Sequence, residues 1–227
     1  MFALSTEEKL QYLVRLMIIL LINPLHECAH AYSAYKLGDD TAKNEGRLTL
    51  SPLAHLDFFG SLLLFFFGFG WAKPVPVNPR NFKEPSKGMM LTAIAGPLSN
   101  VAAALLAVIA YQLLNGQEYF GIHDGMIYMS PQTKGYAMWM IYEFIVININ
   151  LFLFNMIPVP PLDGSRVMTY LLPQKAAFWF IKNERYFYGA VMLLMMTGIL
   201  SYPLYFLNTK VYDLLLLVTS WIPAVTA

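Results

Sequence analysis

The chain has 227 residues, of which 57% are hydrophobic and 13% are charged, and its formal net charge is +1. Soluble domains carry about 25% charged residues, so this chain has too few charges to cover a water-soluble globule, and we expect lipid to cover part of it. The balanced charge gives no electrostatic reason to expect nucleic acid as a partner, and a single cysteine, Cys28, excludes a disulfide within the chain.

The first predicted helix covers about residues 10–36 and ends before Gly38. Acidic residues precede its apolar run and no small-residue cleavage pattern follows, so we do not expect a removable signal peptide. Four further helices are predicted at about residues 88–114, 136–157, 186–199 and 203–221. Because roughly 20 apolar residues span a bilayer, the second and third helices are long enough to cross one.

Between the first two helices lie three shorter segments of a different character. Residues 58–70, FFGSLLLFFFGFG, are apolar but too short to cross comfortably, which indicates a partial or re-entrant piece. GRLTL (46–50) and WAKPVPVNP (71–79) look like short strands. The predicted fold is therefore an all-α polytopic membrane protein with about five to six transmembrane helices and a small membrane-associated β-hairpin or sheet after the first helix. We expect one domain over residues 1–227, with a motif-bearing core at about 10–172 and accessory helices at about 177–223.

The distribution of Lys and Arg predicts an orientation in the membrane. Basic residues gather before the second helix and after the third, whereas residues 115–135 contain only Lys134. The two basic loops should therefore be cytoplasmic. If residues 58–70 do not cross, residues 23–30 and 155–164 lie at a similar depth, and two motifs far apart in the sequence can meet.

The first of these motifs is HECAH, residues 26–30. His26 and His30 are one helical turn apart on one face, which suits two ligands of a single zinc ion. Glu27 lies about 100° around the helix, where it can act as a general base on a water without taking a ligand position. The alternative is a set of incidental polar residues at a helix end.

The second motif, NMIPVPPLDG, covers residues 155–164. Three prolines break the third helix there, and broken backbone at membrane depth is tolerated only inside protein or along a wet cavity. Asp163, just past the break, is the best candidate for the third protein ligand that a catalytic zinc needs. Taken alone, a solvated turn aspartate or a helix cap would be the simpler interpretation.

These residues resemble the site-2 protease family of intramembrane zinc metalloproteases, in particular its short bacterial branch without PDZ or CBS domains. The resemblance is carried by HECAH, AGPLSN and NMIPVPPLDG, and is extended by HAYSAYKLGDD, GRLTLSPLAHLD and GWAKPVPVNPRNF. It implies one Zn²⁺ per chain on His26, His30 and Asp163, with Glu27 as general base. It also implies a multi-pass protein of the bacterial cell membrane whose site faces the cytoplasmic side.

Other residues are candidates for substrate contacts. Asn155 and Asn100 are candidates to steady the substrate or its developing oxyanion, although both could instead form interhelical hydrogen bonds, and for Asn100 we favour packing. If 71–79 is a strand, Lys73 and Val75 keep their N–H donors on the edge opposite Pro74, and Gly70 permits close approach of a substrate strand. An ordinary internal hairpin is the alternative. For His55 and Asp57 a structural role is favoured.

The sequence thus predicts a zinc endopeptidase that cuts peptide bonds in or near transmembrane segments of other membrane proteins. Its partners would be such a substrate and the lipid bilayer, with no nucleic acid. Two other functions use the same residues: a membrane metal carrier or sensor, and a catalytically silent scaffold that binds membrane helices. A carrier would not need Glu27 beside His26, and a scaffold would not need the intact ligand set.

Overall fold

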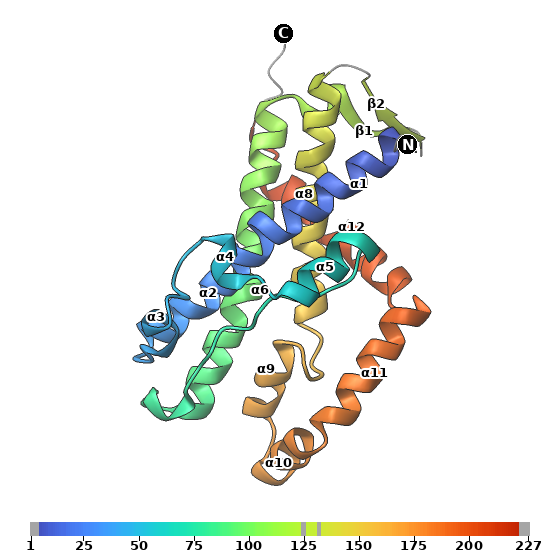
Figure 1. Cartoon of the computed structure of the whole chain (residues 1–227). Helices are drawn as coiled ribbons and strands as arrows, with labels where there is room; N and C mark the ends of the chain where they lie inside the picture. Colours follow the sequence, from blue (N-terminus) through green and yellow to red (C-terminus); the bar gives the residue numbers. More distant parts are fainter. Residues whose placement is uncertain (1–4, 124–125, 131–132, 223–227) are drawn as a thin grey trace.

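Helices make up most of the chain in the computed structural model, which describes residues 5–123, 126–130 and 133–222 (Figure 1). The elements in chain order are α1 (Thr6–Met17), the π-helical turn η1 (Ile18–Ile22), α2 (Asn23–Lys36), α3 (Thr41–Asn44), α4 (Pro52–His55), α5 (Phe58–Phe67), the 3₁₀ turn η2 (Pro79–Asn81), α6 (Pro85–Leu113), α7 (Gly116–Tyr119), β1 (Phe120–His123), β2 (Met126–Met129), α8 (Thr133–Asn155), α9 (Gly164–Leu171), α10 (Gln174–Lys182), α11 (Glu184–Thr197) and α12 (Ser201–Val218).

The first predicted helix is confirmed as one continuous rod made of α1, η1 and α2. Ser5 and Glu8 form a reciprocal capping box at its start. The π turn ends where Pro24 enters, because proline has no N–H and its ring would collide with a carbonyl of the preceding turn. The Asn23 N–H therefore donates to Ile18 O, five residues earlier. This wider turn lies directly before the two histidines of HECAH.

Three helical stretches are long and apolar enough to cross a membrane: Glu8–Lys36, Pro85–Leu113 and Thr133–Asn155. They correspond to the first three predicted helices. α11 and α12 also form where helices were predicted, but neither meets these criteria, and α11 has only 14 residues. The protein is therefore a largely helical membrane protein with three candidate spans among the described residues, rather than an established five or six.

α6 lies at the centre of the packing, with α2 on one side and α8 on the other, and α12 packs against α8 (Figure 1). The buried apolar core lies mainly between α6 and α8, at Ala104, Val108, Tyr111, Ile145 and Ile149. Many large apolar side chains on the outer faces are exposed, as expected for surfaces that lipid covers.

Residues 58–67 form the short helix α5, which agrees with the prediction that this apolar segment only partly enters the membrane. Ten residues rise about 15 Å, half of the roughly 30 Å hydrocarbon thickness, so α5 is too short to cross. Asp57 caps its start by accepting from the Gly60 N–H. Arg15 of α1 holds its end, because Nη1 donates to Phe65 O at 2.8 Å and to Phe66 O at 2.9 Å. These contacts satisfy carbonyls that a helix end leaves without partners.

The prediction of a β-hairpin after the first helix is wrong. Neither 46–50 nor 71–79 forms a strand, and the antiparallel pair found in the described residues is β1–β2, between α6 and α8. Pro74 and Pro76 cannot donate to a ladder. Side chains bond several other backbone groups of 71–78 instead, as Arg47 does at the carbonyls of Lys73 and Pro74.

The contact between Arg15 and α5 leads to the first prediction. Arg15→Met should lower the melting temperature of the detergent-solubilised protein, because hydrogen bonds from a charged donor contribute roughly 1 to 3 kcal/mol. Arg185→Met is the control, since Arg185 is exposed and, within the described part of the chain, its side chain hydrogen-bonds only the Tyr186 hydroxyl. Equal melting temperatures for the two variants would show that α5 is held without Arg15.

Candidate metal centre

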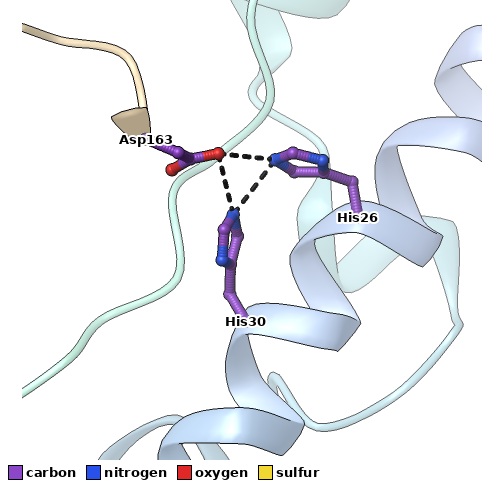
Figure 2. Close-up of side chains that lie close together, drawn as sticks. All are labelled: His26, His30 and Asp163. Atoms are coloured by element: carbon purple, nitrogen blue, oxygen red, sulfur yellow. Dashed lines mark hydrogen bonds and ion pairs between the residues drawn. The ribbon is translucent and has the colours of Figure 1, made fainter. Parts of the chain in front are cut away.

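Three side chains from two distant parts of the chain converge on one point (Figure 2). His26 Nε2 and His30 Nε2 lie 3.0 Å apart, and Asp163 Oδ2 lies 3.2 Å from the first and 3.4 Å from the second. Both histidines are buried and Asp163 is partly buried. Two ligand atoms that share one tetrahedral zinc, each about 2.1 Å from it, lie about 3.4 Å apart. The spacing of all three atoms therefore suits a zinc ion.

A chain of hydrogen bonds fixes which nitrogen of His26 carries its proton. Asn148 Nδ2 donates to the backbone carbonyl of Phe144, so Asn148 Oδ1 is left to accept from Asn100 Nδ2 at 2.8 Å. Asn100 Oδ1 then faces His26 Nδ1 at 2.6 Å and can only accept. His26 Nδ1 must therefore be the donor, and in the neutral ring Nε2 carries a lone pair directed at the convergence point.

His30 is oriented in the same way by a backbone group. Its Nδ1 lies 2.7 Å from Thr92 O, which is an acceptor only, so Nδ1 donates and Nε2 again carries the lone pair. Opposite them, Asp163 Oδ2 is buried and has no hydrogen-bond partner among the described residues. A metal cation would satisfy the two lone pairs and the carboxylate oxygen together, and an N₂O set with a fourth position open is the ligand pattern of catalytic zinc.

The turn after α8 brings Asp163 to the histidines. Proline residues end α8 and shape residues 156–163, which include a cis bond between Pro160 and Pro161. Gly164 lies so close to Met156 O and Ile157 O that a Cβ there would overlap them. Burial raises the pKa of the Asp163 carboxyl, but when no metal is bound, protonated imidazoles of His26 and His30 outweigh burial and hold that pKa below its usual range. The carboxylate therefore stays ionised, as a metal ligand must.

Gly96 allows α6 to approach the two histidines closely. A Cβ at this position would overlap His30 Nε2 and lie 2.7 Å from His26 Cε1. Gly96 lies between Thr92 and Asn100 on the same helix, and each of these is about one turn away and orients one imidazole. One face of α6 therefore both makes room for the ligands and sets their protonation.

The remaining predicted residues occupy different surroundings. Glu27 is half-buried, and its Oε2 accepts from the Val75 N–H at 3.1 Å. Lys73 N–H donates to His55 O at 2.9 Å, so both predicted docking donors are engaged within the chain. Gly70 lies against α5, where a Cβ would overlap Gly60 O. Asn155 is the last residue of α8, and its side chain makes no hydrogen bond within the described ranges.

Sequence reasoning did not foresee how Asn100, Asn148 and Thr92 act together. Both polar atoms of Asn100 are engaged, one with His26 and one with Asn148 on α8, so it links a metal ligand to an interhelical bond. A signal was present, because AGPLSN places an amide four residues after a glycine in a helix of small residues. The partner of that amide depends on the packing of α2 on α6, which the sequence of either helix alone does not define.

Comparisons with known proteins agree with this arrangement. The profile of peptidase family M50 matches residues 12–198. The chain is 42% identical over 191 residues, 84% of its own length and 84% of the relative, to the "Putative zinc metalloprotease YwhC" of Bacillus subtilis (strain 168). It is 28% identical over 144 residues, 62% of its length and 50% of the relative, to the "Putative zinc metalloprotease Rip2" of Mycobacterium tuberculosis. No solved structure matches.

The close approach at Gly96 predicts that Gly96→Ala displaces an imidazole and lowers the zinc content of the purified protein several-fold. Zinc per chain is measured by mass spectrometry of the metal after purification without chelator. Gly189→Ala in α11 is the control, because its Cβ would meet nothing within 4 Å. Full zinc content in Gly96→Ala would show that the site has more room than the structure gives it.

The hydrogen-bond chain to His26 predicts that Asn100→Leu weakens zinc binding by roughly 10- to 100-fold, the usual effect of removing an outer partner of a ligating histidine. Competition with a fluorescent chelator measures the affinity. Asn208→Leu is the matched control, because Asn208 is also a buried interhelical amide but bonds Val146 O and Asn150. Equal affinities in the two variants would contradict a role for Asn100 in orienting His26.

Proposed function

The chain belongs to peptidase family M50, the site-2 protease family, and from this premise we propose that it hydrolyses peptide bonds in or beside transmembrane segments of other membrane proteins. The family and its relatives make the protein a zinc-dependent membrane metalloprotease. The observation that carries the finer proposal is the convergence of His26, His30 and Asp163 within a bundle of apolar helices. A peptide bond reaching this point must come from a segment that lies in the membrane or at its border.

The proposed chemistry divides among few residues. His26, His30 and Asp163 hold zinc, which when bound supplies a Lewis acid and makes water nucleophilic near neutral pH. Glu27, adjacent to His26, accepts the proton of the attacking water and passes it to the leaving amide nitrogen. We assign Asn155 to donate a hydrogen bond to the carbonyl oxygen on which charge develops. Its amide, which no described residue engages, supports that role.

Room for a substrate is present next to α8. A cavity of about 1060 Å³ is lined by residues of α8 and α12 and by Gly68 and Gly70. Phe154, beside Asn155, also lines it. This supports a substrate segment that approaches between the last helices and the 68–70 loop. The proposal retains Gly70, Lys73 and Val75 as neighbours of an extended substrate, while the N–H groups of Lys73 and Val75 stay bonded to His55 O and Glu27 Oε2.

The proposed membrane topology places the site toward the cytoplasm. α5 is too short to cross, so α2 ends on the side where α8 also ends (Figure 1). Basic residues lie on this side before α6, in its first turn, and after α9: Arg80, Lys83, Lys87, Lys175, Lys182 and Arg185. By the positive-inside rule that side is cytoplasmic, which supports the proposal of a multi-pass protein of the bacterial cell membrane with its site toward the cytoplasm.

The test is Glu27→Gln, which keeps the size of the side chain and removes its basicity. It should retain one zinc per chain and cleave fluorescein-labelled casein at least 100-fold more slowly than wild type, the usual scale of general-base catalysis. In cells, membrane proteomics of the variant should show stabilised membrane stubs that wild type removes.

Wild-type rates in Glu27→Gln would contradict the mechanism. Zinc flux into liposomes that this substitution leaves unchanged would favour a metal carrier.

A further inference from the structure

The extended segment 71–78 contacts the proposed general base through one backbone group. Val75 N–H donates to Glu27 Oε2 at 3.1 Å. Pro74 and Pro76 on either side have no N–H, so Val75 is the only backbone donor of this tripeptide. Glu27 Oε1 accepts no hydrogen bond among the described residues, which leaves one carboxylate oxygen held and the other available for a proton.

A buried arginine holds the backbone on which this donor lies. Arg47 is only 4% exposed, and its Nη2 donates to Lys73 O at 2.6 Å while Nη1 donates to Pro74 O at 3.2 Å. No carboxylate lies within salt-bridge distance of Arg47 in the described part of the chain. Burying a guanidinium without a counter-charge is costly unless its donors are used. Here Nη1 and Nη2 donate to the two carbonyls directly before Val75, while Nε has no hydrogen-bond partner among the described residues.

His55 completes the same anchor. Its Nε2 lies 2.8 Å from Thr49 O, an acceptor only, so Nε2 donates and Nδ1 faces Arg47 Nη2 as an acceptor at 3.5 Å. The backbone carbonyl of His55 accepts from the Lys73 N–H at 2.9 Å. Lys73 is therefore fixed through both of its backbone polar groups.

The other end of the segment is fixed by Asp39. This buried carboxylate accepts from the Asn78 N–H and from Asn81 Nδ2, each at 2.7 Å. Burial raises the pKa of Asp39, but the hydrogen bonds from Thr41, Asn78 and Asn81 outweigh it and hold that pKa below its usual range. The carboxylate thus stays ionised, and both ends of 73–78 are held by charged, buried side chains.

We propose that Arg47 is a positioning residue for Glu27, acting through the backbone of residues 73–75. By fixing the Lys73 and Pro74 carbonyls, Arg47 places the Val75 N–H against Glu27 Oε2 and thereby orients the free oxygen of the carboxylate. The inference rests on the proposed function, in which Glu27 transfers the proton. Small displacements of such groups reduce rates by up to about 100-fold.

The first experiment removes only the hydrogen-bond donor. Val75→Pro should lower kcat for labelled casein about tenfold or more, with KM within about twofold and zinc content unchanged. Val77→Pro is the matched control, because the Val77 N–H makes no hydrogen bond within the described ranges. Val75→Ala keeps the N–H, so its kcat should stay well above that of Val75→Pro. Val75→Pro cleaving as fast as Val77→Pro, with full zinc, overturns the proposal.

The second experiment tests the arginine. Arg47→Ala should lower kcat to a similar degree, Arg47→Lys should recover part of the rate because its ammonium can still donate to a carbonyl, and Arg47→Ala combined with Val75→Pro should be no slower than either alone. Arg80→Ala, an exposed arginine at the end of the segment, is the control. A kcat loss that only follows zinc loss, or additive effects in the double variant, contradicts a positioning role.

A third measurement does not depend on activity. Deuterium uptake of the peptide covering residues 71–78 should rise in Arg47→Ala and stay at the wild-type level in Arg80→Ala. Unchanged uptake in Arg47→Ala overturns the proposal even if casein is cleaved. If wild type cleaves no faster than Glu27→Gln while uptake rises as expected, the proposed function fails and the structural part of the inference holds.

Discussion

Two imidazole lone pairs and one carboxylate oxygen directed at a single point repel each other, and the rest of the site can be understood as what keeps them there. The repulsion is strong because His26 and His30 are buried, where water screens charges least. A metal cation between the three atoms removes it and bonds all three at once. The fold must therefore hold each ligand in place. Acceptors bond the Nδ1 atoms of both histidines, and Gly164 packs closely against Met156 and Ile157 in the turn that carries Asp163.

α6 supplies no ligand, but it contributes most of the groups that orient the two histidines. Thr92, Gly96 and Asn100 lie about one turn apart on the face that meets α2. Asn100 meets the His26 imidazole and Thr92 meets the His30 imidazole, and Gly96 lies between these two acceptors on α6. The bond from Asn100 to Asn148 then ties this pair of helices to α8, the helix that leads to Asp163. One interhelical hydrogen-bond chain thus links all three parts of the candidate site.

Much of this could be predicted from the sequence, because the relevant signals are local. Apolar length placed the first three helices, the i, i+4 spacing placed His26 and His30 on one face, and the prolines before Asp163 marked a broken helix end at a matching depth. The hairpin was misplaced because the alternation in 71–79 is that of an extended chain, and an extended chain needs no strand partner when Arg47, Asp39 and Glu27 bond its backbone. These side-chain partners lie 26 to 48 residues away in the sequence, so the local sequence of 71–79 does not predict them.

The π turn before α2 separates two requirements that a single straight helix would have to meet together. Residues 6–17 must present apolar side chains to lipid, and residues 26–30 must face α6. A π turn contains one residue more than the α-helical turn it replaces, and one residue corresponds to about 100° of rotation. Deleting one residue from Ile18–Ile22 would let the rod become regular and would turn His26 and His30 away from Thr92 and Asn100, while the hydrophobic length would hardly change. The direction in which His26 and His30 point around the helix axis is thus set independently of the length of the membrane span, although both belong to the same helix.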